Sequence, residues 1–157
     1  MINVNRTDSA DNDFSLLANA LEQELAVRDG DEQELYAELN KVDFLQHAVV
    51  AYHNNEAAGC GAFREYEPGV MEIKRMFVTM EKRNLGIASV VLYELENWCR
   101  ELGVQQCVLE TGKNQPEAIA FYKKHNYVPI ANFGKYAGSE NSVCFEKRLN
   151  PGYNSGS

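Results

Sequence analysis

The chain has 157 residues and a formal net charge of −8, with 15 lysine and arginine residues against 23 aspartate and glutamate residues. This length fits one domain with its own hydrophobic core, and the acidic balance argues against nucleic-acid binding, which requires a basic face. No apolar run is long enough to cross a membrane and the N-terminus lacks the pattern of a secretory signal, so we expect a soluble cytoplasmic protein without a membrane partner.

The cysteines agree with a reducing compartment. They are scattered through apolar stretches without a C-x-x-C pair, and the histidines show no ligand spacing to them. These residues are Cys60, Cys99, Cys107 and Cys144, with His47, His53 and His125. We therefore expect buried, reduced thiols and no metal site.

The N-terminal part of the chain predicts one strand and two helices. Residues 2–6 alternate apolar and polar side chains, as a strand does. Asp11 or Asp13 then caps a helix that Gly30 breaks. The apolar face of this helix consists of Phe14, Leu17, Leu21 and Leu25. A second helical piece is expected over residues 32–40.

A meander of three strands is predicted next. The strands are expected over residues 48–52, 57–66 and 70–78. Short connections rich in asparagine, proline and glycine separate them, which indicates antiparallel pairing. Within the second strand, Gly59 and Gly61 suggest a close backbone approach or a bulge.

A long amphipathic helix begins at Gly86, and Gly103 caps its C-terminus. Its predicted apolar face consists of Ile87, Val91, Leu95, Trp98 and Leu102, and its predicted polar face of Ser89, Glu96, Asn97 and Arg100.

The rest of the chain predicts a strand, a helix and two strands. Residues 105–110 form a strand that a crossover connects in parallel to the preceding one, and Pro116 opens a helix that carries Tyr122. The last strands are expected over residues 127–131 and 142–147. We therefore predict an α+β fold with a mixed, mostly antiparallel central sheet flanked by helices, as a single domain over residues 1–149, followed by a flexible tail over 150–157.

The turn before the long helix is a candidate anion site. The first helical amides have no intrahelical partner, Gly86 has no Cβ to block a ligand, and Lys82 and Arg83 add positive charge. The simpler interpretation is a surface loop with two solvated bases, and this turn alone does not decide between the two.

Two motifs resemble those of the GNAT family, the acetyl-coenzyme A-dependent N-acetyltransferases. The run Arg83, Asn84, Leu85, Gly86, Ile87 and Ala88 is similar to the Arg/Gln-x-x-Gly-x-Gly/Ala pyrophosphate loop of that family. The later run Gln115, Ala118, Tyr122 and Asn126-Tyr127 is similar to a second family motif, in which an Asn stands at the first position and a Gly at the fourth. The departure at Gln115 puts one pantetheine contact in doubt.

The resemblance covers residues 2–149 and implies the GNAT fold, with acetyl-CoA as the acetyl donor. The implied cofactor-binding residues are Met76, Phe77, Val78, Arg83, Asn84, Leu85, Gly86, Ile87, Ala88, Ser89 and Gln115. It also implies that Tyr122 donates a proton to the departing thiolate. The alternatives are a core tyrosine whose hydroxyl is satisfied and, for residues 76–78, ordinary core side chains.

Glu72 is the candidate general base, 11 positions before Arg83, where several GNAT enzymes keep a catalytic glutamate. Strand alternation places it with Lys74, Met76 and Val78 on one face. The alternative is a structural ion pair of Glu72 with Lys74 or Arg75. Further candidates are Glu65, Tyr66, Glu110 and a chain of water molecules.

These patterns favour an N-acetyltransferase that acts on a primary amine, either of a small molecule or of a protein or peptide, by direct transfer. The alternative is a non-catalytic acyl-CoA-binding module that serves as a sensor or structural partner. The acceptor, the preference for acetyl over another acyl group, and homodimer formation are left open by the sequence.

Overall fold

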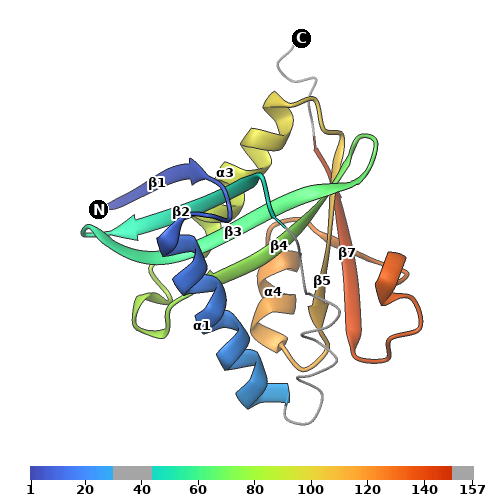
Figure 1. Ribbon diagram of the computed structural model, residues 1–157. Coiled ribbons are helices and arrows are strands. Elements are labelled where there is room, and N and C mark those ends of the chain that lie inside the picture. Colours follow the sequence, from blue (N-terminus) through green and yellow to red (C-terminus); the bar gives the residue numbers. More distant parts are fainter. Residues whose placement is uncertain (30–43, 150–157) are drawn as a thin grey trace. The chain divides into compact units, whose positions relative to one another are not determined.

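The computed structural model describes residues 1–29 and 44–149 (Figure 1). Its strands are β1 (Ile2–Thr7), β2 (His47–His53), β3 (Glu56–Glu67), β4 (Val70–Val78), β5 (Gln106–Gly112), β6 (Val128–Ile130) and β7 (Ser142–Arg148). Its helices are α1 (Asn12–Asp29), α3 (Ile87–Glu101) and α4 (Pro116–Lys124), with single 3₁₀ turns at η2 (Met80–Lys82) and η3 (Gly134–Tyr136). The helix predicted over residues 32–40, the break at Gly30 and the tail over 150–157 lie outside the described residues.

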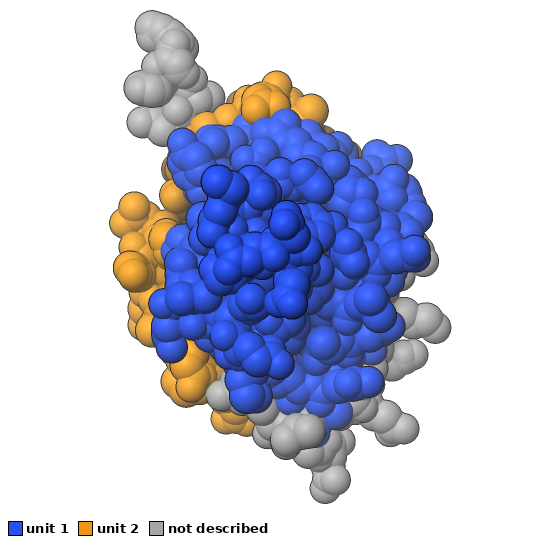
Figure 2. Space-filling model, turned by 90° about the vertical axis from the view of Figure 1, so that its left-hand side faces the viewer, with its two compact units in different colours: residues 1–64, 73–98 blue, residues 65–72, 99–157 orange. Residues whose placement is uncertain are grey.

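The strands form one sheet in the order β1-β2-β3-β4-β5-β7-β6, and the predicted α+β fold with a mixed sheet is confirmed. Antiparallel pairing joins β1 to β2, β2 to β3, β5 to β7 and β6 to β7. The chain divides into two compact units, coloured separately in Figure 2: unit 1 contains residues 1–64 and 73–98, and unit 2 contains residues 65–72 and 99–157. Strand β4 contributes to both units.

In unit 1, helix α1 packs against one face of β2 and β3 (Figure 1). Asp11 caps this helix, because its Oδ1 accepts a hydrogen bond of 3.0 Å from the amide of Phe14. The shared core consists of Phe14, Leu17, Leu45, Ala48, Val50, Cys60, Ala62 and Phe77. Phe14 and Leu17 of the predicted apolar face of α1 thus lie in this core, and Leu21 packs against it.

Helix α3 packs on the other face of β3, where Gly59 and Gly61 lie. A Cβ on Gly61 would come within 2.8 Å of Leu95 and 3.0 Å of Val91, and a Cβ on Gly59 would come within 2.9 Å of Ile87. The close backbone approach predicted from these glycines is therefore confirmed, since any side chain there would push the helix away.

The C-terminus of α3 matches the predicted glycine cap. Gly103 has φ 82°, its amide donates to the carbonyl of Arg100, and the amide of Val104 donates to the carbonyl of Cys99, which is the Schellman arrangement. One residue of each predicted face of α3 is misassigned. Leu102, assigned to the apolar face, is 50% exposed because the helix ends before it, and Glu96, assigned to the polar face, is buried.

In unit 2, β7 pairs with both β5 and β6, and Cys144 lies opposite Glu110 on one side and Ile130 on the other. Pro116 opens α4 as predicted, and the helix contributes Tyr122 to a buried group of aromatic rings. Strands β5 and β7 carry Glu110 and Ser142, and Gln115 lies at the N-cap of α4.

Strand β4 is irregular at Arg75, whose φ is 61°. Beyond this residue the predicted alternation holds, because Met76 contacts the α3 side while Phe77 belongs to the α1 core. At Arg75 itself the regular pleat is interrupted, so the alternation inferred for the whole strand does not extend across it.

Candidate functional site

The turn before α3 has the geometry of an anion site. The first helical hydrogen bond runs from the amide of Val90 to the carbonyl of Gly86, at 3.2 Å, and the amides of the first turn have no acceptor within the helix. Gly86 has φ 84°, and no heavy atom lies within 4 Å of the position that a Cβ would take. The position that a Cβ of Gly86 would take is therefore open, next to the start of the helix.

Arg83 lies beside this turn and is held by two groups of unit 1. Its Nε donates to the carbonyl of Val78 at 2.9 Å, and its Nη2 lies 2.7 Å from Oε1 of Glu24 on α1. The guanidinium also lies 5.5 Å from the ring centroid of Phe77. The charge predicted for anion binding is thus oriented by β4 and countered by a carboxylate of α1.

Lys82 is countered in the same way. Its Nζ lies 3.3 Å from Oε1 of Glu56 and 3.0 Å from Nδ1 of His53. Partial desolvation and then the charge of Lys82 lower the pKa of His53, which keeps its ring neutral and able to accept. Both bases of the turn are therefore ion-paired with carboxylates of unit 1.

The residues predicted to line the donor thioester end β4. The side chain of Met76 faces α3, Phe77 is buried against α1, and the amide of Thr79 donates to the carbonyl of Ala58 at 2.9 Å. Of the three side chains, Phe77 packs in the core, as the alternative interpretation expected, while Met76 and Val78 are partly buried.

Glu72, the candidate base, is buried in unit 2. Its exposed fraction is 2%, and its Oε2 accepts a hydrogen bond of 2.8 Å from the hydroxyl of Tyr136, which is equally buried. Nη1 of Arg75, one of the two alternative partners, lies 3.5 Å from Oε2 of Glu22. The sequence did not reveal Tyr136, which lies 64 positions away in an irregular turn.

A second carboxylate of unit 2 is arranged like the first. Oε2 of Glu110 accepts a hydrogen bond of 2.7 Å from Oγ of Ser142, which also lies 3.1 Å from Oγ of Ser139. Sequence reasoning named Glu110 as a further candidate but missed Ser142. The register of β5 and β7, which pairs Gly112 with Ser142, accounts for the contact.

Tyr122 is 7% exposed, and its ring lies 5.7 Å from that of Tyr127 and 6.3 Å from that of Phe145. Burial and then the charge of Glu110 raise the pKa of its hydroxyl, so this group holds its proton throughout the physiological range. The burial of the ring agrees with a core tyrosine, and the role of proton donor stays a prediction.

Gln115 occupies the N-cap position of α4 and is 7% exposed. Its side chain makes no capping hydrogen bond to the helix. Its backbone N–H donates to the carbonyl of Gly112 at 3.0 Å. Of the further candidates, Tyr66 is 39% exposed and its ring packs edge-on against Phe133 at 5.0 Å, and Glu65 is exposed.

The four cysteines are free and buried, as predicted. No group of three or more acidic, histidine or cysteine side chains in residues 1–29 and 44–149 could hold a metal ion. Within the same ranges, none of the helices combines the length and apolar character needed to cross a bilayer.

Comparison with known proteins gives one consistent result. The family model described as the acetyltransferase (GNAT) family matches residues 14–127. An IAA acetyltransferase of Azospirillum brasilense is 35% identical over 102 residues, which cover 64% of this chain and 67% of that protein. The N-acetyltransferase YsnE of Bacillus subtilis is 30% identical over 63% of this chain and 67% of that protein.

Solved structures share the fold over nearly the whole length. A Klebsiella pneumoniae protein described as an acyl-CoA N-acyltransferase has a TM-score of 0.79 and 29% identity, covering 96% of this chain and 99% of that one. A Bacillus anthracis streptothricin acetyltransferase, solved with acetyl coenzyme A, has a TM-score of 0.60 and 21% identity over 68% of this chain and 64% of that one.

Proposed function

We propose, because this chain belongs to the GNAT acetyltransferase family, that it transfers the acetyl group of acetyl-CoA to a primary amine by direct attack. Acetyl transfer from acetyl-CoA is the activity of the family, and the primary amine is the part proposed here. The observation that carries the proposal is the turn at Gly86, which combines open space, a helix N-terminus and an adjacent guanidinium.

On the donor side, we assign the pyrophosphate to the first-turn amides of α3, from Ile87 to Ser89, together with Arg83. Gly86 would admit the phosphates, with Asn84, Leu85 and Ala88 completing the turn. The backbone of residues 76–78 and the side chain of Gln115 are assigned to the pantetheine arm. The open space at Gly86 supports the first of these assignments directly.

On the chemical side, we assign Glu72 as the base and Tyr122 as the acid. The neutral amine nitrogen attacks the thioester carbonyl, a C–N bond forms and the C–S bond breaks. Glu72 accepts the proton that the amine nitrogen loses, and Tyr122 donates a proton to the leaving thiolate. The position of Tyr122 in the second family motif, within the stretch that the family model matches, supports its role.

Two observations bear on the class of acceptor, the net charge of the chain and the name of one relative. The net charge of −8 favours cationic amines over anionic acceptors in electrostatic steering. The similar A. brasilense protein is named an IAA acetyltransferase, and IAA therefore belongs in the acceptor panel beside the amines.

The test is release of free coenzyme A from acetyl-CoA over a panel of peptide N-termini, lysine, polyamines, amino sugars and IAA. Turnover with one class of primary amine, with the acetylated product identified by mass, is the expected result. Binding of acetyl-CoA without turnover on any acceptor would favour the non-catalytic acyl-CoA-binding module. Turnover on IAA alone would contradict the amine assignment.

A further inference from the structure

The stretch from the end of β6 to the first residue of β7, residues 131–142, brings hydroxyl groups to two carboxylates of unit 2. Near its middle, Tyr136 donates to Oε2 of Glu72 at 2.8 Å. At its end, Ser142 donates to Oε2 of Glu110 at 2.7 Å. The two carboxylates thus receive their hydroxyl donors from one short segment.

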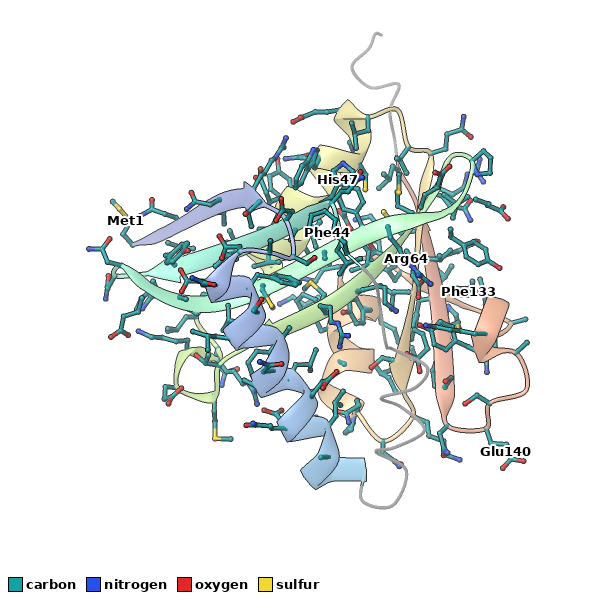
Figure 3. The ribbon with its side chains drawn as sticks, viewed as in Figure 1. Met1, Phe44, His47, Arg64, Phe133 and Glu140 are labelled. Carbon is teal, nitrogen blue, oxygen red and sulfur yellow. The ribbon has the colours of Figure 1, made fainter. Side chains whose placement is uncertain are left out.

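Tyr136 is fixed in this segment by rings and by backbone hydrogen bonds. Phe133, labelled in Figure 3, packs edge-on against Tyr136 at 5.4 Å and against Tyr66 at 5.0 Å. The amide of Tyr136 donates to the carbonyl of Phe133 at 2.9 Å. Gly134 has φ 55°, and a Cβ there would lie 3.2 Å from Cε1 of Tyr66, so glycine permits the turn to approach this ring.

The Glu72 carboxylate needs such a donor because it is almost wholly buried. Both Glu72 and Tyr136 are 2% exposed, and a buried carboxylate is stable in the ionised form only when donors replace the water it has lost. The charges of both carboxylates also affect the pKa of the Cys144 thiol. The pKa of this thiol is raised to about 11, mainly by burial and further by the charges of Glu110 and Glu72. A backbone hydrogen bond acts in the opposite direction.

We propose that Tyr136 is a positioning residue for Glu72, whose carboxylate it holds in one orientation for accepting the proton of the acceptor amine. This inference rests on the proposed role of Glu72 as the base. Tyr136 is assigned no contact with either substrate. Removal of its hydroxyl should therefore reduce kcat and leave acetyl-CoA binding unchanged.

The experiment is a double-mutant cycle with Tyr136→Phe, Glu72→Gln and the combined variant, measured with the acceptor found in the amine panel. Tyr136→Phe is expected to lower kcat by about tenfold, the scale of one lost hydrogen bond to a charged group, with the KM for acetyl-CoA unchanged. In the Glu72→Gln background the same substitution should lower kcat no further, because the carboxylate that it positions is gone.

Tyr52→Phe is the matched control. The hydroxyl of Tyr52 donates to Oδ2 of Asp13 at 2.6 Å, so this variant also loses a hydrogen bond from tyrosine to a carboxylate, but in unit 1. It should retain the wild-type kcat even where its melting temperature falls. A kcat loss equal to that of Tyr136→Phe would show a general effect of destabilisation and overturn the inference.

The other outcomes separate this inference from the proposed function. A normal kcat for Tyr136→Phe with a defective Glu72→Gln would overturn the role of Tyr136 alone. Multiplicative losses in the combined variant would also overturn it. A normal Glu72→Gln variant would remove the proposed base, and the role of Tyr136 with it.

Gly134→Ala provides a second test if Tyr136→Phe fails to fold. It keeps the hydroxyl but crowds Tyr66, and the positive φ disfavours alanine, so the turn that holds Tyr136 should shift. A lower kcat with unchanged KM for acetyl-CoA, absent in the Glu72→Gln background, is expected. A folded variant with wild-type kcat would contradict the positioning role.

Discussion

Arg83 and Glu24 form an ion pair in unit 1, with 2.7 Å between Nη2 and Oε1. The guanidinium that we assign to the pyrophosphate therefore already has an anionic partner, from helix α1. A pyrophosphate and the carboxylate would compete for the same donors, since both bind the fork of the guanidinium.

Glu24→Gln should therefore tighten the binding of coenzyme A. The pair is partly exposed, so its loss should raise the affinity by about two- to fivefold, in keeping with the modest strength of such pairs. Isothermal titration calorimetry of both proteins measures this difference. Unchanged or weaker binding would mean that Glu24 does not compete with the cofactor.

Glu22→Gln is the control for this prediction. Glu22 also lies on α1 and is paired with an arginine, but that arginine is Arg75, which has no assigned contact with the cofactor. The variant removes the same charge from the same helix. An equal gain in affinity would point to long-range electrostatics in place of competition at Arg83.

Gly86→Val should weaken the binding of coenzyme A by more than about tenfold, because a branched side chain would fill the open space beside the helix amides and disfavour the backbone conformation there. Gly69→Val separates these two effects. Gly69 also has a φ of 82° and no heavy atom within 4 Å of its Cβ position, but it lies in the turn between β3 and β4. Comparable melting temperatures with loss of affinity in Gly86→Val alone are expected, and equal affinity losses would contradict a site at Gly86.

Much of the fold could be predicted because its signals are local. The period of α3 and the glycine cap at Gly103 each lie within a few positions of the structure that they specify, whereas Gly59 and Gly61 indicate a close approach without naming the helix that makes it. The errors in α3 concern Glu96, which is buried, and Leu102, which is 50% exposed because the helix ends before it. Helical periodicity cannot reveal either fact.

The partners of the candidate site residues could not be predicted. Glu72 and Tyr136 are 64 positions apart, and Arg83 and Glu24 are 59 positions apart. Their contacts depend on strand register and on turns that have no regular period. The motif around Gly86 identified the residues of the turn. The carboxylates that pair with its bases, Glu24 and Glu56, became apparent only in the structure.

Stability should fall as the pH is lowered, and His47 contributes to this loss. Its ring stacks on Phe63 at 4.8 Å and lies edge-on to Trp98 at 4.9 Å, and burial lowers its pKa. The folded state therefore binds fewer protons than the unfolded state. The contribution of His47 is complete above the unfolded pKa of about 6.5 and is lost as the pH falls through the lower folded value.

His47→Phe tests this contribution because it keeps an aromatic ring but cannot titrate. Melting temperatures between about pH 5 and about pH 8, the range of an ordinary histidine, should fall less steeply on acidification for the variant than for the wild type. His53, whose pKa is also lowered, supplies a remaining slope in both proteins. Identical slopes in the two proteins would exclude His47 as a source of the acid sensitivity.

Tyr122→Phe tests the proposed acid and keeps the ring that packs against Tyr127 and Phe145. We expect kcat to fall by roughly 100-fold, the low end of the contribution of a positioned general acid, with little change in coenzyme A affinity. Acetyl donors with leaving thiols of different acidity provide the decisive comparison. A more acidic thiol needs no proton to depart, so the defect should shrink as the thiol pKa falls. A defect that is the same for every thiol would assign Tyr122 to the packing of unit 2.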